Sequence, residues 1–219
     1  MKVTLFNSVS LDGCVTGFDL DIAGHYARLG RLGADALLVG SRTAKSGIET
    51  FLESVPPEKP EDLYPPKLKR GDRRPYWVIP DSRGALKGLL HVYRQAGHGK
   101  DVIVLVSAST PKAYIKYLRE RRYPYFLCGS GRVDLRKALA LLGREYKFRR
   151  VVSDTGAGLN SALLQAGLVK EIILLVWPAV AGDKGLNFVK GLGAVRPLRL
   201  ISSKRTGPAL LLRYAVSRG

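Results

Sequence analysis

The chain has 219 residues and a hydrophobic content of 46%, which is enough for one large domain or two small ones with a real core. It contains no apolar run long enough to cross a membrane and no signal-peptide pattern after Met1, so we expect a soluble cytoplasmic protein rather than a membrane or secreted one. The formal net charge of +18 suits either a nucleic-acid-binding protein or an enzyme that acts on phosphorylated small molecules.

The basic residues cluster at positions 67–74 (KLKRGDRR) and 119–122 (RERR). Neither cluster is interleaved with the aromatic residues on which single-stranded nucleic acid would stack. Both fall at loop or helix-end positions, where basic side chains also complement helix dipoles. A phosphorylated small molecule is therefore favoured over nucleic acid as the partner. The scarcity of Asn, Gln and Met beside abundant Arg is typical of a thermophile.

Short apolar runs rich in Val, Ile and Leu recur along the chain, and such runs are typical of strands buried on both faces of a sheet. We predict strands at residues 3–6, 36–39, 77–79, 102–106, 125–127, 151–153, 172–177 and 210–216. The last of these follows a Thr-Gly-Pro turn signal and is expected to return antiparallel to its neighbour.

Helical patterns separate several of these strands. Residues 22–32 predict one helix, and Thr110 followed by Pro111 begins another. Asp134 is a natural N-cap for a helix over 135–142 that Gly143 would close, and residues 161–167 form a short helix ending in glycine. Strands that alternate with helices predict an α/β fold of three layers, with a mixed, mostly parallel sheet and one domain over 1–219.

Residues 53–75 interrupt this pattern with six prolines mixed with charges. A loop of this length inside a compact domain is usually functional or loosely ordered. Two interpretations are open, a surface excursion stiffened by proline and a substrate lid, and the first is favoured.

The stretch 151–160 (VVSDTGAGLN) carries the strongest functional signal, because a strand runs there into a glycine-rich turn and a helix start. Such a turn offers free backbone N–H groups and a positive helix end to an anion such as a phosphate. The glycines do not match the dinucleotide fingerprint G-x-G-x-x-G, since Ser161 stands at its third small position. A simple tight turn is the alternative interpretation.

Two more strand ends have the same character. Gly40 would let the backbone approach a ligand, and Arg42 and Thr43 could bond a diphosphate. Ser82 and Arg83 offer a hydroxyl and a guanidinium suited to a ribose 2′-phosphate. Each could instead be only a turn with a solvent-facing charge, but ligands bind at the carboxyl ends of strands in such sheets.

The remaining reactive residue types carry little signal. His25, His91 and His98 have no metal or triad spacing, so we interpret all three as surface residues, and we predict no metal site. Cys14 and Cys128 are interpreted as small core residues in a reducing compartment. A chain without a clear acid–base cluster fits a reaction whose difficult step a cofactor carries.

Four blocks in order resemble the pyrimidine reductases of riboflavin biosynthesis, which include the C-terminal domain of the bacterial deaminase-reductase and have a dihydrofolate-reductase-like fold. The blocks are residues 8–13 (SVSLDG), 35–43 (DALLVGSRT), 78–82 (VIPDS) and 154–182, which includes LN at 159–160 and AGLV at 166–169.

This resemblance implies NADPH as cofactor and a ribosylamino-pyrimidine phosphate as substrate, whose ribosyl group is reduced to ribityl. Ser10, Asp12 and Asp154 would lie at the substrate, with Asp12 or Asp154 helping to place protons in catalysis. The implied cofactor-binding residues are Gly40, Arg42, Thr43, Ser82, Arg83, Thr155, Gly156, Leu159 and Asn160. The resemblance also implies a homodimer.

Three features depart from the family pattern, and one of them is Thr155 in place of a glycine. Asp154 is one methylene shorter than the family's glutamate, and the family's D-D-P-x-L-T segment is replaced after Thr43 by residues 44–49 (AKSGIE). The cofactor is thus better specified than the substrate. The alternatives are a paralogue that reduces another pterin or pyrimidine, and a non-catalytic nucleotide- or nucleic-acid-binding module.

Overall fold

The structure is a computed structural model that describes residues 1–217. The chain forms two compact units, Met1–Ala34 together with the chain from Arg149 onward, and Asp35–Phe148. The second unit is thus inserted into the sequence of the first. A single reductase domain over 1–219 stays a prediction, because two compact units can belong to one functional domain. No helix of the described residues is long and apolar enough to cross a membrane.

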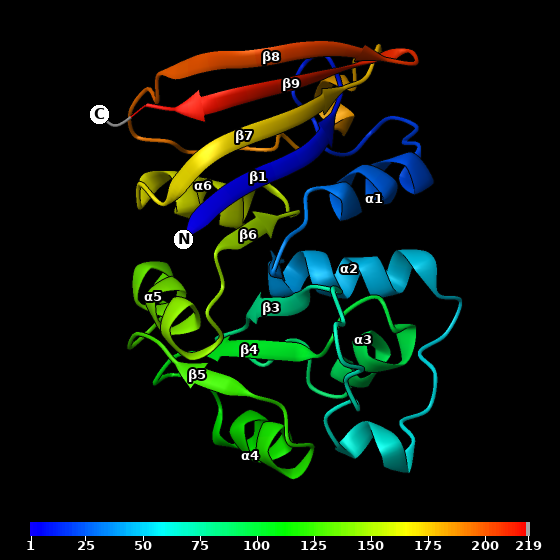
Figure 1. Cartoon of the computed structure of the whole chain (residues 1–219), viewed down its shortest axis with the longest axis vertical. Coiled ribbons are helices and arrows are strands. Elements are labelled where there is room, and N and C mark those ends of the chain that lie inside the picture. The colour runs from blue at the N-terminus through cyan, green and yellow to red at the C-terminus, as the bar shows by residue number, and fades with distance from the viewer. Residues whose placement is uncertain (218–219) are drawn as a thin grey trace. The chain divides into compact units, whose positions relative to one another are not determined.

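The first unit contains a mixed set of strands in the order β6-β1-β7-β9-β8, and Figure 1 shows β9 between β7 and β8. β1 pairs in parallel with β6 and β7, whereas β9 pairs antiparallel with β7 and β8. Because β1 has a neighbour on each side, every residue after Lys2 in it is buried. The elements are β1 (Lys2–Val9), α1 (Ile22–Arg31), β6 (Arg150–Ser153), α6 (Ala157–Gln165), β7 (Val169–Val176), η2 (Gly182–Lys184), β8 (Leu198–Thr206) and β9 (Ala209–Val216).

The second unit holds parallel strands in the order β5-β4-β3-β2. The apolar run VIVLV forms β4, and all its residues are fully buried, as near-continuous apolar runs in parallel sheets require. The elements are β2 (Ala36–Leu38), α2 (Ser41–Phe51), η1 (Pro60–Leu63), β3 (Tyr76–Pro80), α3 (Leu90–Ala96), β4 (Val102–Val106), α4 (Lys112–Glu120), β5 (Tyr125–Leu127) and α5 (Leu135–Glu145).

Local signals located several helices correctly. Asp134 is the N-cap of α5 and accepts a hydrogen bond of 3.0 Å from the Lys137 N–H. Asp21 caps α1 in the same way, at 2.8 Å from the Gly24 N–H. The prediction that Gly143 ends α5 is wrong, because the helix continues to Glu145. A glycine in a helix costs only about 1 kcal/mol relative to alanine, so packing of the apolar face can override it.

The sequence pattern missed α2 and β8, and it placed the start of α6 too late. In α2 only Ala44 and Ile48 are buried, which leaves too few apolar positions for a clear period. In β8 eight of the nine residues are exposed, so no alternation of buried and exposed residues marks it as a strand.

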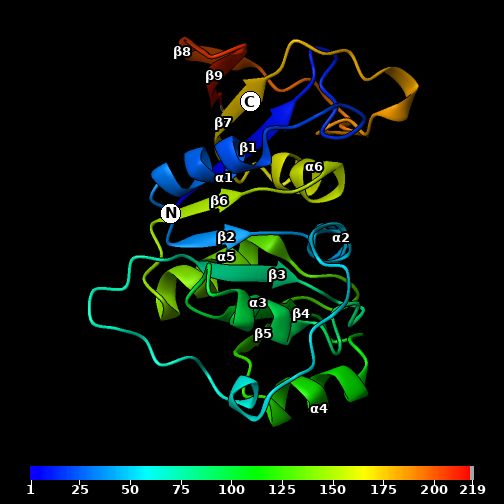
Figure 2. The same cartoon turned by 90° about the vertical axis from the view of Figure 1, so that its right-hand side faces the viewer.

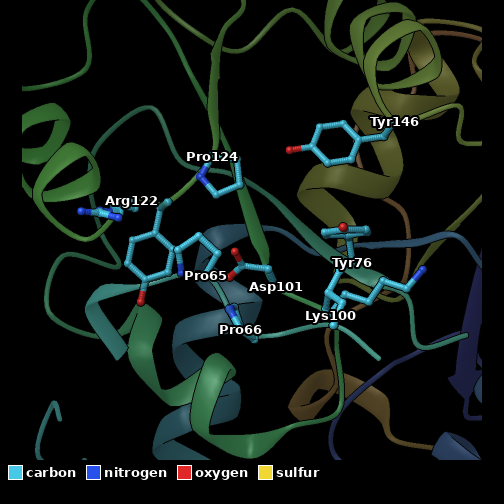
Figure 3. A pocket seen from close by; sticks show the side chains of 10 residues that line it. Pro65, Pro66, Tyr76, Lys100, Asp101, Arg122, Pro124 and Tyr146 are labelled. Atoms are coloured by element: carbon cyan, nitrogen blue, oxygen red, sulfur yellow. The ribbon is translucent and has the colours of Figure 1, made fainter. Parts of the chain in front are cut away.

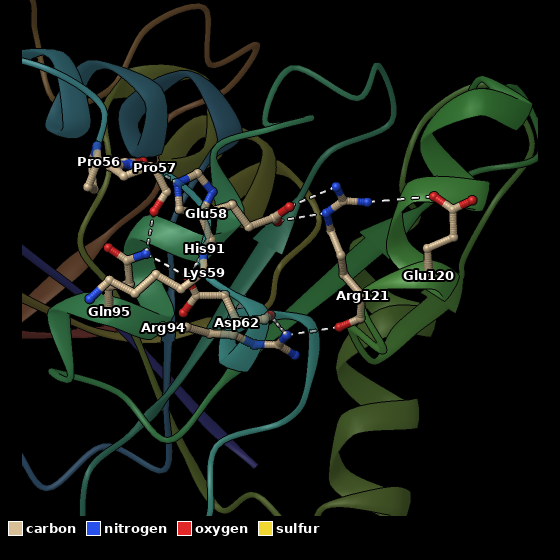
Figure 4. Close-up of polar contacts among 10 residues, drawn as sticks. All are labelled: Pro56, Pro57, Glu58, Lys59, Asp62, His91, Arg94, Gln95, Glu120 and Arg121. Atoms are coloured by element: carbon tan, nitrogen blue, oxygen red, sulfur yellow. Dashed lines mark hydrogen bonds and ion pairs between the residues drawn. The ribbon is translucent and has the colours of Figure 1, made fainter.

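The proline-rich segment, residues 53–75, runs over the surface of the second unit (cyan in Figure 2) and is fixed there by polar contacts, as Figure 4 shows. The Arg121 guanidinium donates two bonds of 2.7 and 2.8 Å to the Glu58 carboxylate. His91 Nε2 lies 2.8 Å from the Pro56 carbonyl oxygen, and Gln95 Nε2 donates to the Pro57 carbonyl at 3.0 Å. These anchors favour the surface excursion over a mobile lid.

The prediction that His91 is a surface residue is wrong, because His91 is only 3% exposed. A carbonyl oxygen can only accept, so Nε2 of His91 donates to Pro56. Cys14 and Cys128 are both buried and free, which confirms the prediction that they are core residues, while the reducing compartment stays a prediction.

Candidate functional site

The predicted cofactor residues of the second unit lie at the carboxyl ends of two neighbouring parallel strands, β2 and β3. Gly40 follows β2 as the N-cap of α2, and Arg42 and Thr43 stand exposed in the first turn of that helix. The first backbone N–H groups of a helix have no partner within the helix and carry partial positive charge. This end of α2 is therefore suited to a phosphate.

The turn after β3 is held by Asp81, a buried residue that the sequence analysis did not single out. Its carboxylate accepts bonds of 3.0 Å from the N–H groups of Ala85 and Leu86. Gly84 has a φ of +71°, and a Cβ there would lie 2.8 Å from the Tyr114 ring. The turn is thus rigid, and it presents Ser82 half-buried and Arg83 exposed. The sequence signal for Asp81 is its place before the Ser-Arg-Gly turn.

In the first unit the predicted residues follow two other neighbouring parallel strands, β1 and β6. Ser10 and Asp12 come directly after β1, and Asp154, Thr155 and Gly156 come directly after β6. Gly156 is the N-cap of α6, with φ −84° and ψ −178°. The structure thus brings the predicted residues together within each unit, at the strand ends where ligands bind in α/β sheets.

Asn160 belongs to a buried network that fixes this turn. Its Nδ2 donates to the carbonyl oxygens of Thr155 and Phe188 at 3.1 and 2.9 Å and contacts Asn7 Oδ1 at 2.9 Å. Asn7 in turn donates to the Thr155 carbonyl at 2.8 Å. The geometry assigns the Asn160 side chain to holding the turn, so its effect on a cofactor is indirect. Leu159 lies half-buried beside it in the first turn of α6.

Asp12 joins two loops. Its carboxylate accepts bonds from Ser10 Oγ at 2.6 Å, from Ala181 N–H at 3.0 Å and from Gly182 N–H at 2.9 Å. The Ser10 hydroxyl and these two amides hold the pKa of Asp12 well below its usual range. Asp12 therefore stays ionised at neutral pH, where it can orient a neighbour but has no proton to donate.

Asp154 is contacted by His25, a residue that the sequence analysis placed on the surface. That placement is wrong, because the buried face of α1 carries His25 together with Leu29, one turn further on. His25 Nε2 lies 3.1 Å from Asp154 Oδ2, and its Nδ1 lies 2.8 Å from Ser8 Oγ. The spacing of His25 and Leu29 on one helix face was the signal that could have identified it.

A separate cavity of about 380 Å³ lies in the second unit at the amino ends of β3, β4 and β5, and Figure 3 shows its lining. Parallel strands place these ends at the edge opposite to the Gly40 and Ser82 turns. The lining residues are Pro65, Pro66, Leu68, Tyr76, Lys100, Asp101, Arg122, Tyr123, Pro124 and Tyr146. None of the predicted site residues lines this cavity.

Comparison with known proteins places these features in one family. Residues 1–212 match the RibD C-terminal domain. The chain is 28% identical over 197 residues to the riboflavin biosynthesis protein RibD of Chlamydia trachomatis, with 87% of this chain and 49% of that protein covered. The chain thus spans about half the length of this curated relative.

Solved structures show the same fold. A pyrimidine reductase-like protein from Corynebacterium diphtheriae superposes with a TM-score of 0.72 at 16% identity, covering 100% of this chain and 92% of that one. The Saccharomyces cerevisiae riboflavin biosynthesis reductase Rib7 gives 0.70 at 20% identity, covering 99% and 90%. The predicted dihydrofolate-reductase-like α/β fold is confirmed by these likenesses.

Proposed function

Because the chain belongs to the RibD C-terminal domain family, we propose that it is an NADPH-dependent reductase of riboflavin biosynthesis. Family membership makes it an oxidoreductase of the pyrimidine reductase type. The proposed substrate is 2,5-diamino-6-ribosylamino-4-pyrimidinone 5′-phosphate, whose ribosyl group would be reduced to ribityl by hydride transfer to C1′. The observation that carries this proposal is the family match over 1–212, which includes every strand-end turn described above. A cytoplasmic location stays a prediction.

The residues present fit a dinucleotide phosphate. In each unit one helix, α6 in the first and α2 in the second, has a glycine as its N-cap, and the positive end of such a helix suits a phosphate group. Arg83 adds a guanidinium that can bind a 2′-phosphate with two parallel hydrogen bonds. When bound, NADPH would supply the hydride. The role of the chain is then to bind and orient the cofactor and the substrate.

The reaction also needs a proton, because reduction of a C=N bond adds a hydride to carbon and a proton to nitrogen. Asp12 is held ionised by its three donors and is poorly suited to this task. Asp154 accepts one bond from His25 and its side chain is 20% exposed. We therefore propose Asp154 as the group that places the proton and Asp12 as an anchor of the substrate loop.

The direct test is oxidation of NADPH, followed by nicotinamide absorbance, with the ribosylamino-pyrimidine phosphate and with dihydrofolate as a competing candidate. Turnover of the first alone supports the proposal, and turnover of the second supports the paralogue alternative. The non-catalytic alternative predicts no turnover and tight nucleic-acid binding that falls steeply with salt.

We expect NADPH to bind more tightly than NADH, and Arg83→Ala to remove most of this preference. A lost hydrogen bond to a charged group costs roughly 1.5–3 kcal/mol. NADH affinity should change little, since NADH has no 2′-phosphate. Calorimetric titration of both cofactors measures the effect.

The matched control is the triple variant of Lys67, Lys69 and Arg70 to alanine. All three are exposed in the proline-rich segment, where charges act only through a screened field. It should keep the wild-type affinity for both cofactors. Equal affinity of the wild type for NADPH and NADH would contradict the assignment of Arg83.

We further propose a homodimer that forms through β8. This strand is the edge of the sheet in the first unit, and Leu198, Leu200 and Ile201 are 43%, 51% and 47% exposed. An exposed edge with apolar side chains is a template for association, and twofold dimers are the commonest oligomers. Strand β7 offers no such edge, because it is paired with β1 and β9 on its two sides.

Light scattering after size exclusion should give a dimer for the wild type and a monomer for Leu200→Asp. Lys204→Asp, on the same strand but without apolar surface, serves as the control and should remain dimeric. A monomeric wild type at micromolar concentration would contradict the proposal.

A further inference from the structure

A continuous chain of hydrogen bonds joins three elements of the first unit. It runs from Ser8 on β1 through His25 on α1 to Asp154 after β6, with distances of 2.8 Å and 3.1 Å. Ser8 is 3% exposed, and the side chains of His25 and Asp154 are 7% and 20% exposed. Exposure thus rises from the inner end of the chain to the carboxylate at the strand-end turn.

The chemistry of the three groups sets where the protons lie. A carboxyl oxygen that carries no hydrogen can only accept, so the contact with Oδ2 of Asp154 places the hydrogen on Nε2 of His25. A neutral imidazole then has a lone pair on Nδ1, and the Ser8 hydroxyl can donate to it. The opposite tautomer would direct the Nε2 lone pair at the carboxylate and is disfavoured. The Asp154 oxygen thereby selects the tautomer, and Ser8 completes it by donating to Nδ1 of His25.

Packing restricts the ring further. The Phe6 ring centroid lies 4.8 Å from that of His25, and the Tyr26 ring stands edge-on at 5.2 Å. Burial, with a further contribution from the charge of Asp154, raises the pKa of Tyr26 to about 12. Tyr26 therefore stays neutral at physiological pH, and it packs against His25 as an uncharged ring.

We propose that His25 is the positioning residue of the reductase, which holds one oxygen of Asp154 so that the carboxyl group can deliver a proton to the substrate nitrogen. This inference rests on the proposed function. In the step, the Asp154 carboxyl group carries its hydrogen on the oxygen that His25 does not hold. C1′ gains the hydride that the bound cofactor would supply, the π bond of C=N breaks, and its electron pair takes the hydrogen of Asp154 as a proton, which leaves the carboxylate. The bound cofactor would supply both electrons of the reduction, and water returns one proton to the Asp154 carboxylate.

The first test uses the protein without cofactor, so that it does not depend on activity. Nitrogen NMR of the three histidines distinguishes a ring nitrogen that carries hydrogen from one that does not. We expect His25 to carry its hydrogen on Nε2, as His91 does beside the Pro56 carbonyl, while the exposed His98 samples both forms. Ser8→Ala and Asp154→Asn should each shift the His25 signals and leave those of His91 in place.

The second test compares kinetics of variants with matched volume. His25→Phe should lower kcat by roughly 10- to 100-fold, part of the 10²- to 10⁴-fold that general acid–base groups contribute, with little change in NADPH affinity. His25→Gln, whose amide can still donate to Asp154, should recover part of the loss. His91→Phe removes a buried histidine of the other unit and should keep the wild-type kcat. If His25→Phe does not fold, the milder Ser8→Ala variant takes its place.

The outcomes separate this inference from the proposed function. Hydrogen on Nδ1 of His25, or an unchanged kcat in folded His25→Phe, overturns the positioning role even if the enzyme reduces its substrate. A wild type without turnover on any candidate overturns the reductase function, and the NMR result then still decides whether His25 holds Asp154.

Discussion

Replacing Gly156 by valine is expected to abolish NADPH binding while the protein remains folded. Gly156 is the N-cap of α6, where the backbone would approach the diphosphate of the cofactor. A valine side chain would occupy that space and shield the first N–H groups of the helix. The backbone angles of Gly156, φ −84° and ψ −178°, are open to any residue, so the substitution causes no backbone strain. Calorimetric titration with NADPH should show no detectable binding.

A control must separate loss of the site from loss of the fold. Gly143→Val on α5 introduces the same side chain where a Cβ would meet no atom within 4 Å. It should bind NADPH as the wild type does, and both variants should keep the wild-type circular dichroism spectrum. Wild-type affinity in Gly156→Val would mean that the cofactor does not approach the chain at this turn.

The fold was predictable where one residue or one short run decides the local structure. The run VIVLV in β4 and the capping residue Asp134 before α5 are such cases. The strand β8 was not predictable, because nearly all its residues are exposed and it therefore shows no alternation of buried and exposed residues. Its structure depends on pairing with β9, which the sequence of β8 alone does not reveal.

The candidate site shows the same limit. The sequence marked Asp12 and Asp154 as equivalent catalytic carboxylates, but their surroundings differ. Asp12 receives bonds from Ala181 and Gly182, which lie 169 and 170 residues further along the chain. Asp154 is held by His25, 129 residues before it. Roles set by such distant partners follow from the tertiary fold, whereas the turns themselves follow from local glycines and strand ends.

We expect the largest loss of stability from replacing Arg94, which contacts the proline-rich segment. Arg94 is on α3, and its side chain is 2% exposed. The guanidinium donates to the Asp101 carboxylate at 2.8 Å and to the carbonyl oxygens of Asp62 and Arg121 at 2.5 and 2.8 Å (Figure 4 shows the two carbonyl contacts). Arg94 also lies over the Tyr123 ring, 3.7 Å from its centroid. One buried cation thus joins η1, the start of β4 and the end of α4.

We expect Arg94→Met to lower the free energy of unfolding by about 3–5 kcal/mol, because methionine keeps the volume but leaves the Asp101 charge buried without its cation. Against a typical total of about 5–15 kcal/mol, this is a large fraction of the stability. Arg144→Met is the control, since that exposed arginine pairs with Glu145 at the surface, and its replacement should cost no more than about 1 kcal/mol. Urea denaturation measures both, and limited proteolysis should show earlier cleavage within residues 53–75 in Arg94→Met. Equal stabilities of the two variants would mean that Arg94 does not fix the proline-rich segment.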